Sequence, residues 1–396
     1  MLTVKSMNIL QITKYFYPAV SFGGPVQCTY NLSKYLVKRG HRVVVYTTDA
    51  SDISSNTKIK EEYRLIDGIE VFYFRSIAKL YAGIFITPSM IQALRKNISS
   101  FNVVHLHEYR TFQNIAFYYL NRNRVPYVLS CHGEFSYQKE SLDWFLLRRV
   151  FETNFGKKLV KDASTLHALS QFEATQFTDA GINRNKIKVV PNGVTPEDFL
   201  DISLTSDFRE FFGINEAEVV LYLGRVHKDK GIDTLLKAFA FLSQRRASIK
   251  LVIAGPDDGF VGTLREIVKD LNLAGKVIFT GSLNRKQVLA AYNCASVVVY
   301  ASIQEGFGIV PLESGLMGKP VIVSDAPAMD FVERGKFGLT VKYGSVLQLT
   351  EALETILNNP EQSKIMGKNG KKFATENFSW NSIGKRFEDI YYDISS

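Results

Sequence analysis

The feature that most constrains the fold is the stretch of residues 295–320, which reads ASVVVYASIQEGFGIVPLESGLMGKP. Residues 297–300 form an apolar, β-branched run that is typical of a buried parallel strand. A glycine-containing turn follows, and apolar residues then recur at helical spacing until Gly318 and Pro320. A strand, a glycine turn and a helix start in this order present free backbone N–H groups and a positive helix end to an anion such as a diphosphate.

Two glutamates bracket this turn. Glu305 precedes it, and Glu313 follows eight residues later. Side chains at this separation cannot share one short turn, so we expect one carboxylate at the strand end and the other on the helix. A glutamate pair on the surface of an ordinary strand–helix unit is the alternative interpretation.

The chain is too long for one compact core. At 396 residues it suits two domains, and strand patterns alternate with helix patterns along its length. This alternation predicts two doubly wound α/β domains. We place the first domain at residues 1–197 and the second at residues 198–377, and we interpret the polar, acidic stretch 195–218 as a linker.

The sequence shows neither a membrane-spanning pattern nor a disulfide framework. No run approaches eighteen consecutive apolar residues, and the first residues lack the pattern of a signal peptide. The three cysteines, Cys28, Cys131 and Cys294, are odd in number and far apart. We therefore expect a cytoplasmic, reducing setting without disulfides or a cysteine metal cluster.

The formal charge of +9 is unevenly distributed. Residues 1–197 hold 25 Lys and Arg against 15 Asp and Glu, whereas the remainder holds 23 against 24. A solvated basic surface and an anionic partner both fit this excess. Nucleic acid is not the expected partner, because no basic and aromatic binding motif accompanies the charge.

Two loops of the first half stand at predicted strand ends. Gly23 and Gly24 fall between the first strand and the first helix, where they let backbone approach a ligand or simply form a flexible turn. The surrounding residues do not match G-x-G-x-x-G, so dinucleotide binding has little support. His132 and Gly133 follow a buried strand, at the edge where open α/β sheets bind ligands. The strand-end group HLHE at residues 105–108 is an incomplete ligand set for a metal.

Two cations follow the first strand of the second half. Arg225 comes after Gly224, and Lys230 precedes Gly231. A guanidinium and an ammonium at the carboxyl end of a strand can converge on phosphate oxygens, although two solvated surface cations are the simpler interpretation. Later strands end at Gly255 and at the GSL group of residues 281–283.

Taken in order, these motifs resemble the retaining glycosyltransferases of family 4, also called glycosyl transferases group 1. EGFG with the E-x7-E spacing, GR…KG, HG and PNGV at residues 191–194 carry the resemblance, which extends over nearly the whole chain. It implies the GT-B fold, in which two Rossmann-like domains face a central cleft. The first domain would bind the acceptor, the second would bind the donor, and a C-terminal helix at residues 378–396 would pack back on the first.

The resemblance also implies roles for individual residues. The expected catalytic residues are His132 near the transferred sugar, Glu305 by the sugar hydroxyls, and Arg225 with Lys230 on the donor diphosphate. The expected donor-binding set is Gly23, Gly24, Arg225, Lys230, Gly255, Ser282, Leu283, Glu305, Gly306, Phe307, Gly308, Ile309, Val310 and Glu313, the last on the nucleoside ribose. Neither a cofactor nor a metal is expected, and no D-x-D triplet occurs among the motif loops.

The predicted function is therefore transfer of a hexose from a nucleoside-diphosphate sugar to a glycan or lipid-linked acceptor, in polysaccharide or glycoconjugate biosynthesis. An epimerase or a phosphorylase of the same fold is the nearest alternative, the latter requiring pyridoxal phosphate. A second alternative is a protein that binds nucleotide sugars without turnover. An assay for donor hydrolysis would distinguish it from an enzyme.

A basic, amphipathic stretch bears on localisation. Trp144, Leu147, Phe151, Phe155 and Leu159 recur at three- and four-residue steps, with Arg and Lys beside them. Such a stripe packs on the core of its own domain or lies on an anionic membrane. The expected location is accordingly the cytoplasm, with peripheral attachment to the inner membrane face as the open alternative.

Overall fold

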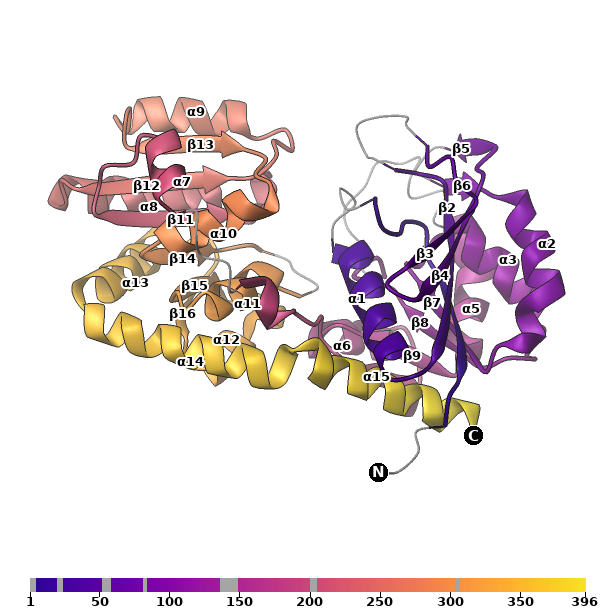
Figure 1. Ribbon diagram of the computed structural model, residues 1–396. Coiled ribbons are helices and arrows are strands. Elements are labelled where there is room, and N and C mark those ends of the chain that lie inside the picture. The colour runs from indigo at the N-terminus through magenta and orange to yellow at the C-terminus, as the bar shows by residue number, and fades with distance from the viewer. Residues whose placement is uncertain are drawn as a thin grey trace. The chain divides into compact units, whose positions relative to one another are not determined.

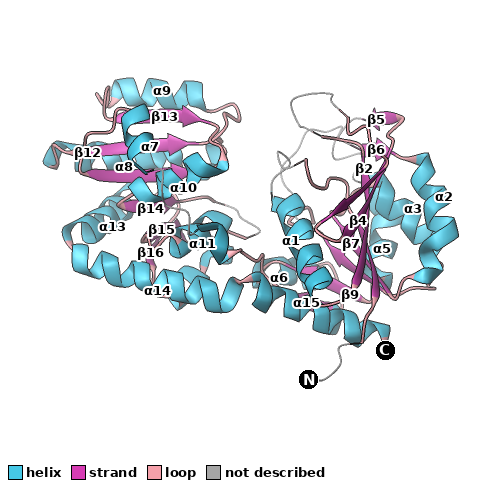
Figure 2. Ribbon diagram, viewed as in Figure 1, coloured by secondary structure: helices cyan, strands magenta, loops and turns pink. Residues whose placement is uncertain are grey.

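The computed structural model describes residues 5–19, 24–51, 58–80, 84–135, 149–199, 205–303 and 307–396. The chain divides into two units, each with its own sheet (Figures 1 and 2). The first unit comprises Met1–Gly193 and Trp380–Ser396, and the second comprises Val194–Ser379. The last helix therefore belongs to the first unit, although the whole second unit separates it from the rest of that unit in sequence.

The first unit contains an eight-stranded sheet in the order β10-β9-β8-β7-β1-β2-β4-β3. Its strands are β1 Asn8–Ile12, β2 Arg42–Thr48, β3 Tyr63–Ile66, β4 Ile69–Phe74, β7 Val103–His107, β8 Tyr127–Ser130, β9 Thr165–Ala168 and β10 Ile187–Val189. All pairs are parallel except β3 with β4. A small hairpin of β5 Ala78–Leu80 and β6 Ile84–Ile86 stands apart from this sheet.

Helices cover both faces of the first sheet (Figure 2). They are α1 Gly24–Lys38, α2 Pro88–Asn97, α3 Phe112–Asn121, α5 Lys157–Asp162, α6 Gln171–Asp179 and α15 Trp380–Ser395. Because successive strand residues point to opposite faces, Ile9 packs with Leu32 of α1 and Phe387 of α15, whereas Leu10 packs with Leu94 of α2 and Phe117 of α3. Helices α1 and α15 thus share one face of the sheet.

The second unit contains a six-stranded parallel sheet in the order β13-β12-β11-β14-β15-β16. Its strands are β11 Glu218–Leu223, β12 Ile249–Ala254, β13 Val277–Gly281, β14 Val297–Tyr300, β15 Val321–Ser324 and β16 Gly338–Val341. Its helices are α7 Thr205–Phe211, α8 Ile232–Arg245, α9 Val261–Asp270, α10 Arg285–Cys294, α11 Ile309–Leu316, α12 Phe331–Arg334, α13 Val346–Asn358 and α14 Pro360–Phe378. Both sheets are doubly wound.

The stretch 195–218 is not the linker that its polarity predicts. It contains a 3-10 turn, Pro196–Phe199, and helix α7. Phe199, Phe208 and Ile214 are buried in the core of the second unit. These three apolar residues pack in the core, and the average composition of the stretch, which is polar and acidic, hides them.

Glycines allow α11 and α14 to pack closely. A Cβ on Gly367 would lie 2.0 Å from the carbonyl oxygen of Gly318, and one on Gly370 would lie 2.8 Å from the Cα of Gly315. Backbone therefore meets backbone where these helices cross. This contact fixes α11, the helix that starts at the glycine turn.

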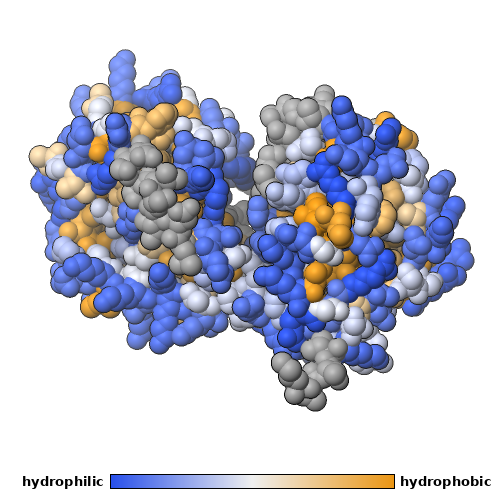
Figure 3. Space-filling model, viewed as in Figure 1, coloured by the Kyte–Doolittle hydropathy of each residue, from blue (hydrophilic) through white to orange (hydrophobic). Residues whose placement is uncertain are grey.

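The described surface is mostly polar in both units (Figure 3). An apolar area appears on the visible face of the first unit in the region of β3 and α1, where Leu65 of β3 is 64% exposed. Among the described residues, no helix is both long enough and apolar enough to cross a bilayer.

Candidate active site

The sheet of the second unit has a topological switch point between β11 and β14. From β11 the chain runs outward to β12 and β13, and then returns to place β14 on the other side of β11. Loops after two such strands diverge and leave a crevice at their carboxyl ends, where open α/β sheets bind ligands. Both predicted cations and the glycine turn lie in the loops after β11 and β14.

Lys230 joins the loops that follow these two strands. Its Nζ donates to the Oγ of Ser302, which follows β14, at 3.4 Å. The backbone N–H of Ile303 donates to the carbonyl of Asp229 at 3.0 Å. Lys230 also lies over the ring of Tyr300, 5.8 Å from its centroid. The ammonium group is therefore held at the switch point by both loops.

Arg225 is more exposed and is paired with an acid. Its side chain is 65% exposed, and its guanidinium donates to the Oδ2 of Asp258 at 2.6 Å. The backbone of Arg225 is fixed because the buried hydroxyl of Tyr222 donates to its carbonyl at 2.8 Å. At this exposure the ion pair is weak, so Asp258 orients the guanidinium without preventing it from binding a stronger anion.

Gly255 has a structural reason to be glycine. Its φ is +140°, and a Cβ there would lie 1.9 Å from the carbonyl oxygen of Gly224. The loops after β11 and β12 therefore approach each other backbone to backbone. Gly255 allows this approach, which sets the position of Arg225 next to Gly224.

The glycine turn leads into α11, as the sequence predicts. Gly308 is the residue before the helix, and no side chain caps the helix start. Pro311 has no N–H, so Ile309 and Val310 carry the N–H groups available at the first turn. The side chain of Phe307 stacks on Phe331 with centroids 5.3 Å apart, so only its backbone faces the turn. Glu305 and Gly306 lie outside the described residues.

Glu313 lies on α11 and is held by two neighbours. Its Oε2 accepts from the hydroxyl of buried Tyr292 at 2.9 Å, and its Oε1 accepts from Arg285 at 2.8 Å. The Arg285 guanidinium in turn lies 4.4 Å from the ring centroid of Phe199. Arg285 starts α10, directly after the loop with Ser282 and Leu283. The carboxylate therefore has one fixed orientation.

His132 occupies the strand-end loop after β8 in the first unit. It has a φ of +51°, a left-handed conformation that is uncommon for a non-glycine residue. The next residue, Gly133, donates its N–H to Glu173 at 2.9 Å, and Glu173 also accepts from Leu169 at 2.7 Å. Burial lowers the pKa of His132 to about 4, so the imidazole is neutral at physiological pH.

Glu108 bridges the switch point of the first sheet, between β1 and β7. Its carboxylate accepts from the Oγ1 of Thr13 at 3.1 Å and from the N–H of Lys14 at 3.0 Å. Burial raises the pKa of Glu108 to about 7 despite the nearby Lys14. The same set of strand ends thus holds a carboxyl group that is only partly ionised at neutral pH.

Neutral histidines lie behind His132. Nδ1 of His107 lies 3.0 Å from Nε2 of His132, and Nε2 of His107 lies 2.6 Å from Oε1 of Gln11. His105 and His167 are also buried and hydrogen-bonded, through Ser130. Burial, with mutual repulsion among the rings, lowers the pKa of His105 and His107 well below the usual value and that of His167 to about 3.

Gly24 is the first residue of α1, the helix that follows β1. It is exposed, and a Cβ there would meet nothing within 4 Å. The fold therefore does not require glycine at this position, unlike at Gly255. Gly23 lies outside the described residues.

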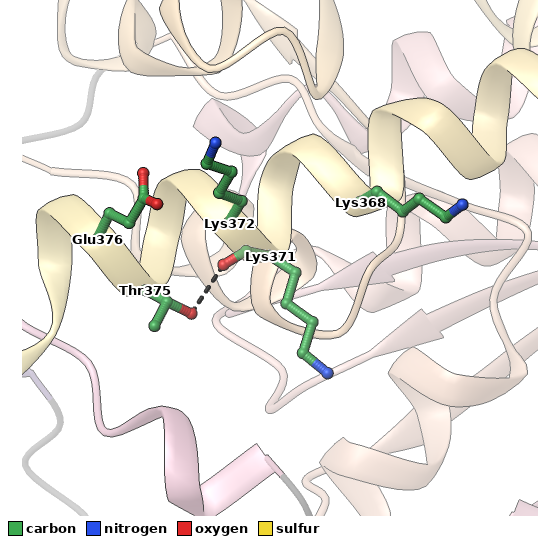
Figure 4. A pocket seen from close by; sticks show the side chains of 5 residues that line it. All are labelled: Lys368, Lys371, Lys372, Thr375 and Glu376. Carbon is green, nitrogen blue, oxygen red and sulfur yellow. Dashed lines mark hydrogen bonds between the residues drawn. The ribbon is translucent and has the colours of Figure 1, made fainter.

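A shallow hollow elsewhere on the surface carries no site. It lies on α14 and is lined by Lys368, Lys371, Lys372, Thr375 and Glu376, all exposed (Figure 4). Thr375 donates back to the carbonyl of Lys371 at 2.7 Å. The hollow holds no buried polar group aimed at a ligand, and it is formed by the outer side of one helix.

The described ranges contain no candidate metal site. No set of three or more His, Cys, Asp or Glu side chains there is arranged to hold an ion. The strand-end histidines hydrogen-bond to one another and to Gln11 instead.

Several neighbours of the predicted residues were not predicted. Asp258, Ser302 and Tyr292 hold Arg225, Lys230 and Glu313, respectively. Each lies between 21 and 72 residues from its partner, so no local pattern reveals the pair. His105 and His107 are recognisable as a strand-end group, but their partners are not.

The chain resembles known glycosyltransferases along most of its length. It is 27% identical over 421 residues to "Uncharacterized glycosyltransferase MJ1607" of Methanocaldococcus jannaschii, with 97% of this chain and 98% of that protein covered. It is 24% identical to the alpha-monoglucosyldiacylglycerol synthase of Streptococcus pneumoniae, with 98% and 86% covered. A GDP-mannose-dependent alpha-(1-6)-phosphatidylinositol monomannoside mannosyltransferase of Mycolicibacterium smegmatis is 28% identical over 243 residues, which is 59% of this chain and 63% of that protein.

Solved structures and family profiles agree with these relatives. Alr3699/HepE of Anabaena, solved with UDP, has a TM-score of 0.76 at 22% identity and covers 98% of this chain and 100% of its own. Sucrose-phosphate synthase of Thermosynechococcus elongatus has a TM-score of 0.75 at 21% identity, with 98% of each chain covered. The profile "Glycosyltransferase Family 4" matches residues 22–198, and "Glycosyl transferases group 1" matches residues 205–373. The chain therefore belongs to the group 1 glycosyltransferases, with the GT-B fold and a family 4 first unit.

Proposed function

We propose that this glycosyltransferase moves a sugar, with retention of anomeric configuration, from a nucleoside-diphosphate sugar to a glycan or lipid-linked acceptor. One observation carries the proposal: Lys230, Arg225 and the uncapped start of α11 lie in the loops at the β11/β14 switch point. Two cations and free N–H groups at such a site suit a diphosphate. The second unit would then bind the donor.

These groups would act on the leaving group. Breaking the bond between the anomeric carbon and the diphosphate oxygen puts negative charge on the diphosphate and positive character on the sugar. Donors that are already in position stabilise this developing charge without reorganising. Lys230 is held by the loops after β11 and β14, and Ile309 and Val310 belong to a helix packed on α14, so these donors are positioned in advance.

Retention would follow from a reaction on one face of the sugar. The acceptor oxygen forms its bond to the anomeric carbon on the side from which the diphosphate leaves, and the acceptor proton passes to a diphosphate oxygen. A covalent intermediate would instead need a free carboxylate at the anomeric carbon. Glu173 and Glu108, the carboxylates next to the His132 and His107 loops, already accept hydrogen bonds from backbone N–H groups.

The remaining roles concern the donor. Glu313 would accept hydrogen bonds from the ribose hydroxyls, because Tyr292 fixes its orientation. Glu305 would contact the hydroxyls of the transferred sugar, and His132 would approach the same sugar from the first unit. No metal or cofactor is needed in this scheme, since the cations and N–H groups neutralise the diphosphate. Activity in excess EDTA would support this.

A panel of UDP-, GDP- and ADP-sugars, with nucleotide release as the readout, tests the function. Release that depends on an added acceptor supports transfer, whereas release without acceptor indicates a hydrolase. NMR of the isolated product tests retention through its anomeric configuration. Binding of nucleotide sugars without turnover for any acceptor tried would favour a non-catalytic binding protein.

The first unit would bind the acceptor, and its charge favours an anionic one. Residues 1–193 with 380–396 contain 27 Lys and Arg against 17 Asp and Glu. The names of the pneumococcal and mycobacterial relatives indicate lipid acceptors, which are found at membranes. A lipid-linked, phosphate-bearing acceptor at the cytoplasmic membrane face would suit this charge, with the protein attached peripherally.

The basic stretch around residues 144–161 offers only part of a membrane surface. Leu159 is buried in the core and Phe151 packs against Tyr109, with ring centroids 5.3 Å apart. Trp144 and Leu147 lie outside the described residues. The exposed cations Arg149, Lys157, Lys158 and Lys161 are then what would attract anionic lipid, at about 1 kcal/mol each.

Co-sedimentation with vesicles tests the membrane proposal. Binding to anionic but not neutral vesicles, weakened by salt, is the expected result. Replacing Arg148, Arg149, Lys157 and Lys158 by Gln should abolish it while nucleotide binding persists. Equal replacement of Lys364, Lys368, Lys371 and Lys372 on α14 is the matched control. Indifference to lipid charge would favour a soluble acceptor.

A further inference from the structure

A continuous chain of hydrogen bonds runs through the core of the first unit from His132 to the backbone of Val190. His132 contacts His107, which contacts Gln11. Gln11 Nε2 lies 3.3 Å from the hydroxyl of Tyr391 on α15, which lies 2.6 Å from His105 Nδ1. Ser130 then connects His105 Nε2 to His167 Nδ1 at 2.6 Å each, and His167 Nε2 ends the chain 2.6 Å from the carbonyl oxygen of Val190.

The end at Val190 gives the chain a direction. A carbonyl oxygen only accepts, so Nε2 of His167 carries the proton. Nδ1 of the neutral ring is then an acceptor, and the single proton of Ser130 points to it. The Ser130 oxygen must accept from Nε2–H of His105, which leaves Nδ1 of His105 as an acceptor.

The hydrogen bonds keep this direction as far as the strand end. The hydroxyl of Tyr391 donates to Nδ1 of His105, so its oxygen is left to accept from the amide nitrogen of Gln11. This orients the amide, because a flipped Gln11 would set two acceptors against each other. Oε1 of Gln11 then accepts from Nε2–H of His107, whose Nδ1 accepts from Nε2–H of His132.

We propose that this buried chain fixes His132 as the Nε2–H tautomer and so presents Nδ1 of His132 to the substrate as a hydrogen-bond acceptor. His132 can then accept from a hydroxyl of a substrate, but it cannot donate to a ring oxygen or a phosphate. Gln11, His105, His107, Ser130, His167 and Tyr391 are positioning residues for it.

The chain is not a path for protons. It ends at an amide carbonyl, which cannot take up a proton, and its middle residues are at most 1% exposed. Neutral rings also suit the stacking of His107 on His105 and on His132, with centroids 4.1 and 5.3 Å apart, because imidazolium rings at these distances would repel each other. The left-handed φ of His132 shows that the surrounding structure holds this residue in place.

Tautomers can be measured on the free full-length protein, without any substrate. Long-range proton–nitrogen NMR correlations of the 15N-histidine-labelled chain distinguish a protonated ring nitrogen from a bare one, and single His→Gln variants assign the six histidines. At pH 7.5 we expect His105, His107, His132 and His167 all to bear the proton on Nε2. A His132 that bears it on Nδ1, or that populates both forms equally, would overturn the proposal.

Two variants and a control test whether the chain causes this state. Tyr391→Phe removes the hydroxyl that orients Gln11, and Ser130→Ala separates His105 from the Val190 end. Loss of one hydrogen bond should lower the tautomer ratio of His132 about fivefold. Tyr392→Phe is the matched control, because the Tyr392 hydroxyl donates to the carbonyl of Lys5 and takes no part in the buried hydrogen-bond chain. If both variants fold and leave His132 unchanged, the chain does not set its tautomer.

A catalytic use of Nδ1 of His132 rests on the proposed function. The tautomer and the proposed function can fail separately. Tyr391→Phe should lower kcat about fivefold with little change in the donor KM, in step with the tautomer ratio. A shifted tautomer without loss of turnover would remove His132 from the proposed function, but the role of the hydrogen bonds in setting its tautomer would stand. An unaltered tautomer with lost turnover would contradict the positioning role of Tyr391, but it would not contradict the proposed function.

Discussion

The two sheets place opposite kinds of chemistry at equivalent points. In the second unit, Lys230 and Arg225 are charged, half-buried or exposed, and paired with groups that a stronger anion can replace. In the first unit, the residues behind His132 are uncharged, fully buried and hydrogen-bonded to one another. Both sets stand at the carboxyl ends of strands next to a switch point.

This difference supports the ligand that we propose for each sheet. Exposed or half-exposed cations such as Arg225 and Lys230 favour a multiply charged diphosphate, because their charge-assisted hydrogen bonds offset the free-energy cost of removing water from it. A neutral acceptor in a preorganised position favours a hydroxyl group, which would gain little from a nearby charge. A doubly wound sheet thus supplies a location, and the residues in its loops decide the ligand.

Removing a cation should have the largest effect. We expect Lys230→Ala and Arg225→Ala each to lower kcat by roughly 10²-fold or more, because charge on the leaving diphosphate would lose a preorganised partner. Steady-state kinetics at saturating donor measure this.

The matched control is Lys228→Ala, which removes an exposed cation two residues from Lys230. The thermal midpoint of all three variants should remain close to that of the parent chain. Near-full turnover of Arg225→Ala or Lys230→Ala would remove that residue from the mechanism.

Acid should weaken the first unit. The pKa values of His105, His107, His132 and His167 are lowered by burial, so the unfolded chain binds more protons than the folded one below pH about 6.5. Their contribution is complete above that pH and is lost as the pH falls. Glu108, with its pKa raised to about 7, has the opposite effect on stability. It offsets about as much of the acid destabilisation as one histidine contributes. We expect a net loss of at least about 2 kcal/mol between pH 7 and 5.

Urea unfolding followed by tryptophan fluorescence measures this loss. Both tryptophans, Trp144 and Trp380, belong to the first unit, so the signal reports that unit alone. A midpoint that does not move between pH 7 and 5 would show that the folded protein does not hold the four histidines in neutral form.

The two glutamates of the E-x7-E motif should separate kinetically. Glu313→Gln should raise the donor KM about tenfold, because a ribose contact is made equally in the ground and transition states. Glu305→Gln should instead lower kcat, since it would act on the reacting sugar. Effects of both on KM alone would mean that the roles assigned to them are wrong.

The smallest effect is expected at Gly24. Gly24→Ala should leave the thermal midpoint unchanged, because a Cβ there meets no atom within 4 Å, and should raise the donor KM by about threefold. Gly255→Ala is the contrasting variant, since its Cβ would collide with Gly224 and lower the midpoint instead. An unchanged KM in Gly24→Ala would place the diphosphate away from α1.

Local pattern was sufficient for fully buried parallel strands such as β14 and for helix α11, whereas the less buried parallel strand β16, Gly338–Val341, was not predicted. Runs such as Val297–Tyr300 are apolar on both faces because helices cover both sides of the sheet. The exposed antiparallel strand β3 was missed, because Tyr63–Ile66 has no fully buried side chain and offers no apolar run. Helix α7 was missed for the same kind of reason, since charged residues surround Phe208.

The buried residues that hold the site residues in place could not be predicted from the spacing of residues in the sequence. Tyr391 and His105 are 286 residues apart, and only the completed sheet brings α15 against β7. The sequence therefore predicts which loops carry the chemistry. The buried partners that orient it depend on packing between segments that are distant in the chain.

The position of Tyr391 has a consequence for biosynthesis. A ribosome that adds about 5–20 residues per second needs roughly 10–40 seconds to make the second unit, Val194–Ser379, after it has finished the first 193 residues. During that time the nascent first sheet lacks the helix that covers Ile9 and Val43, and His105 lacks its phenol partner. The protein thus gains its oriented histidine only as its last residues emerge, and proteolytic loss of a few C-terminal turns would disable a chain whose motifs are all intact.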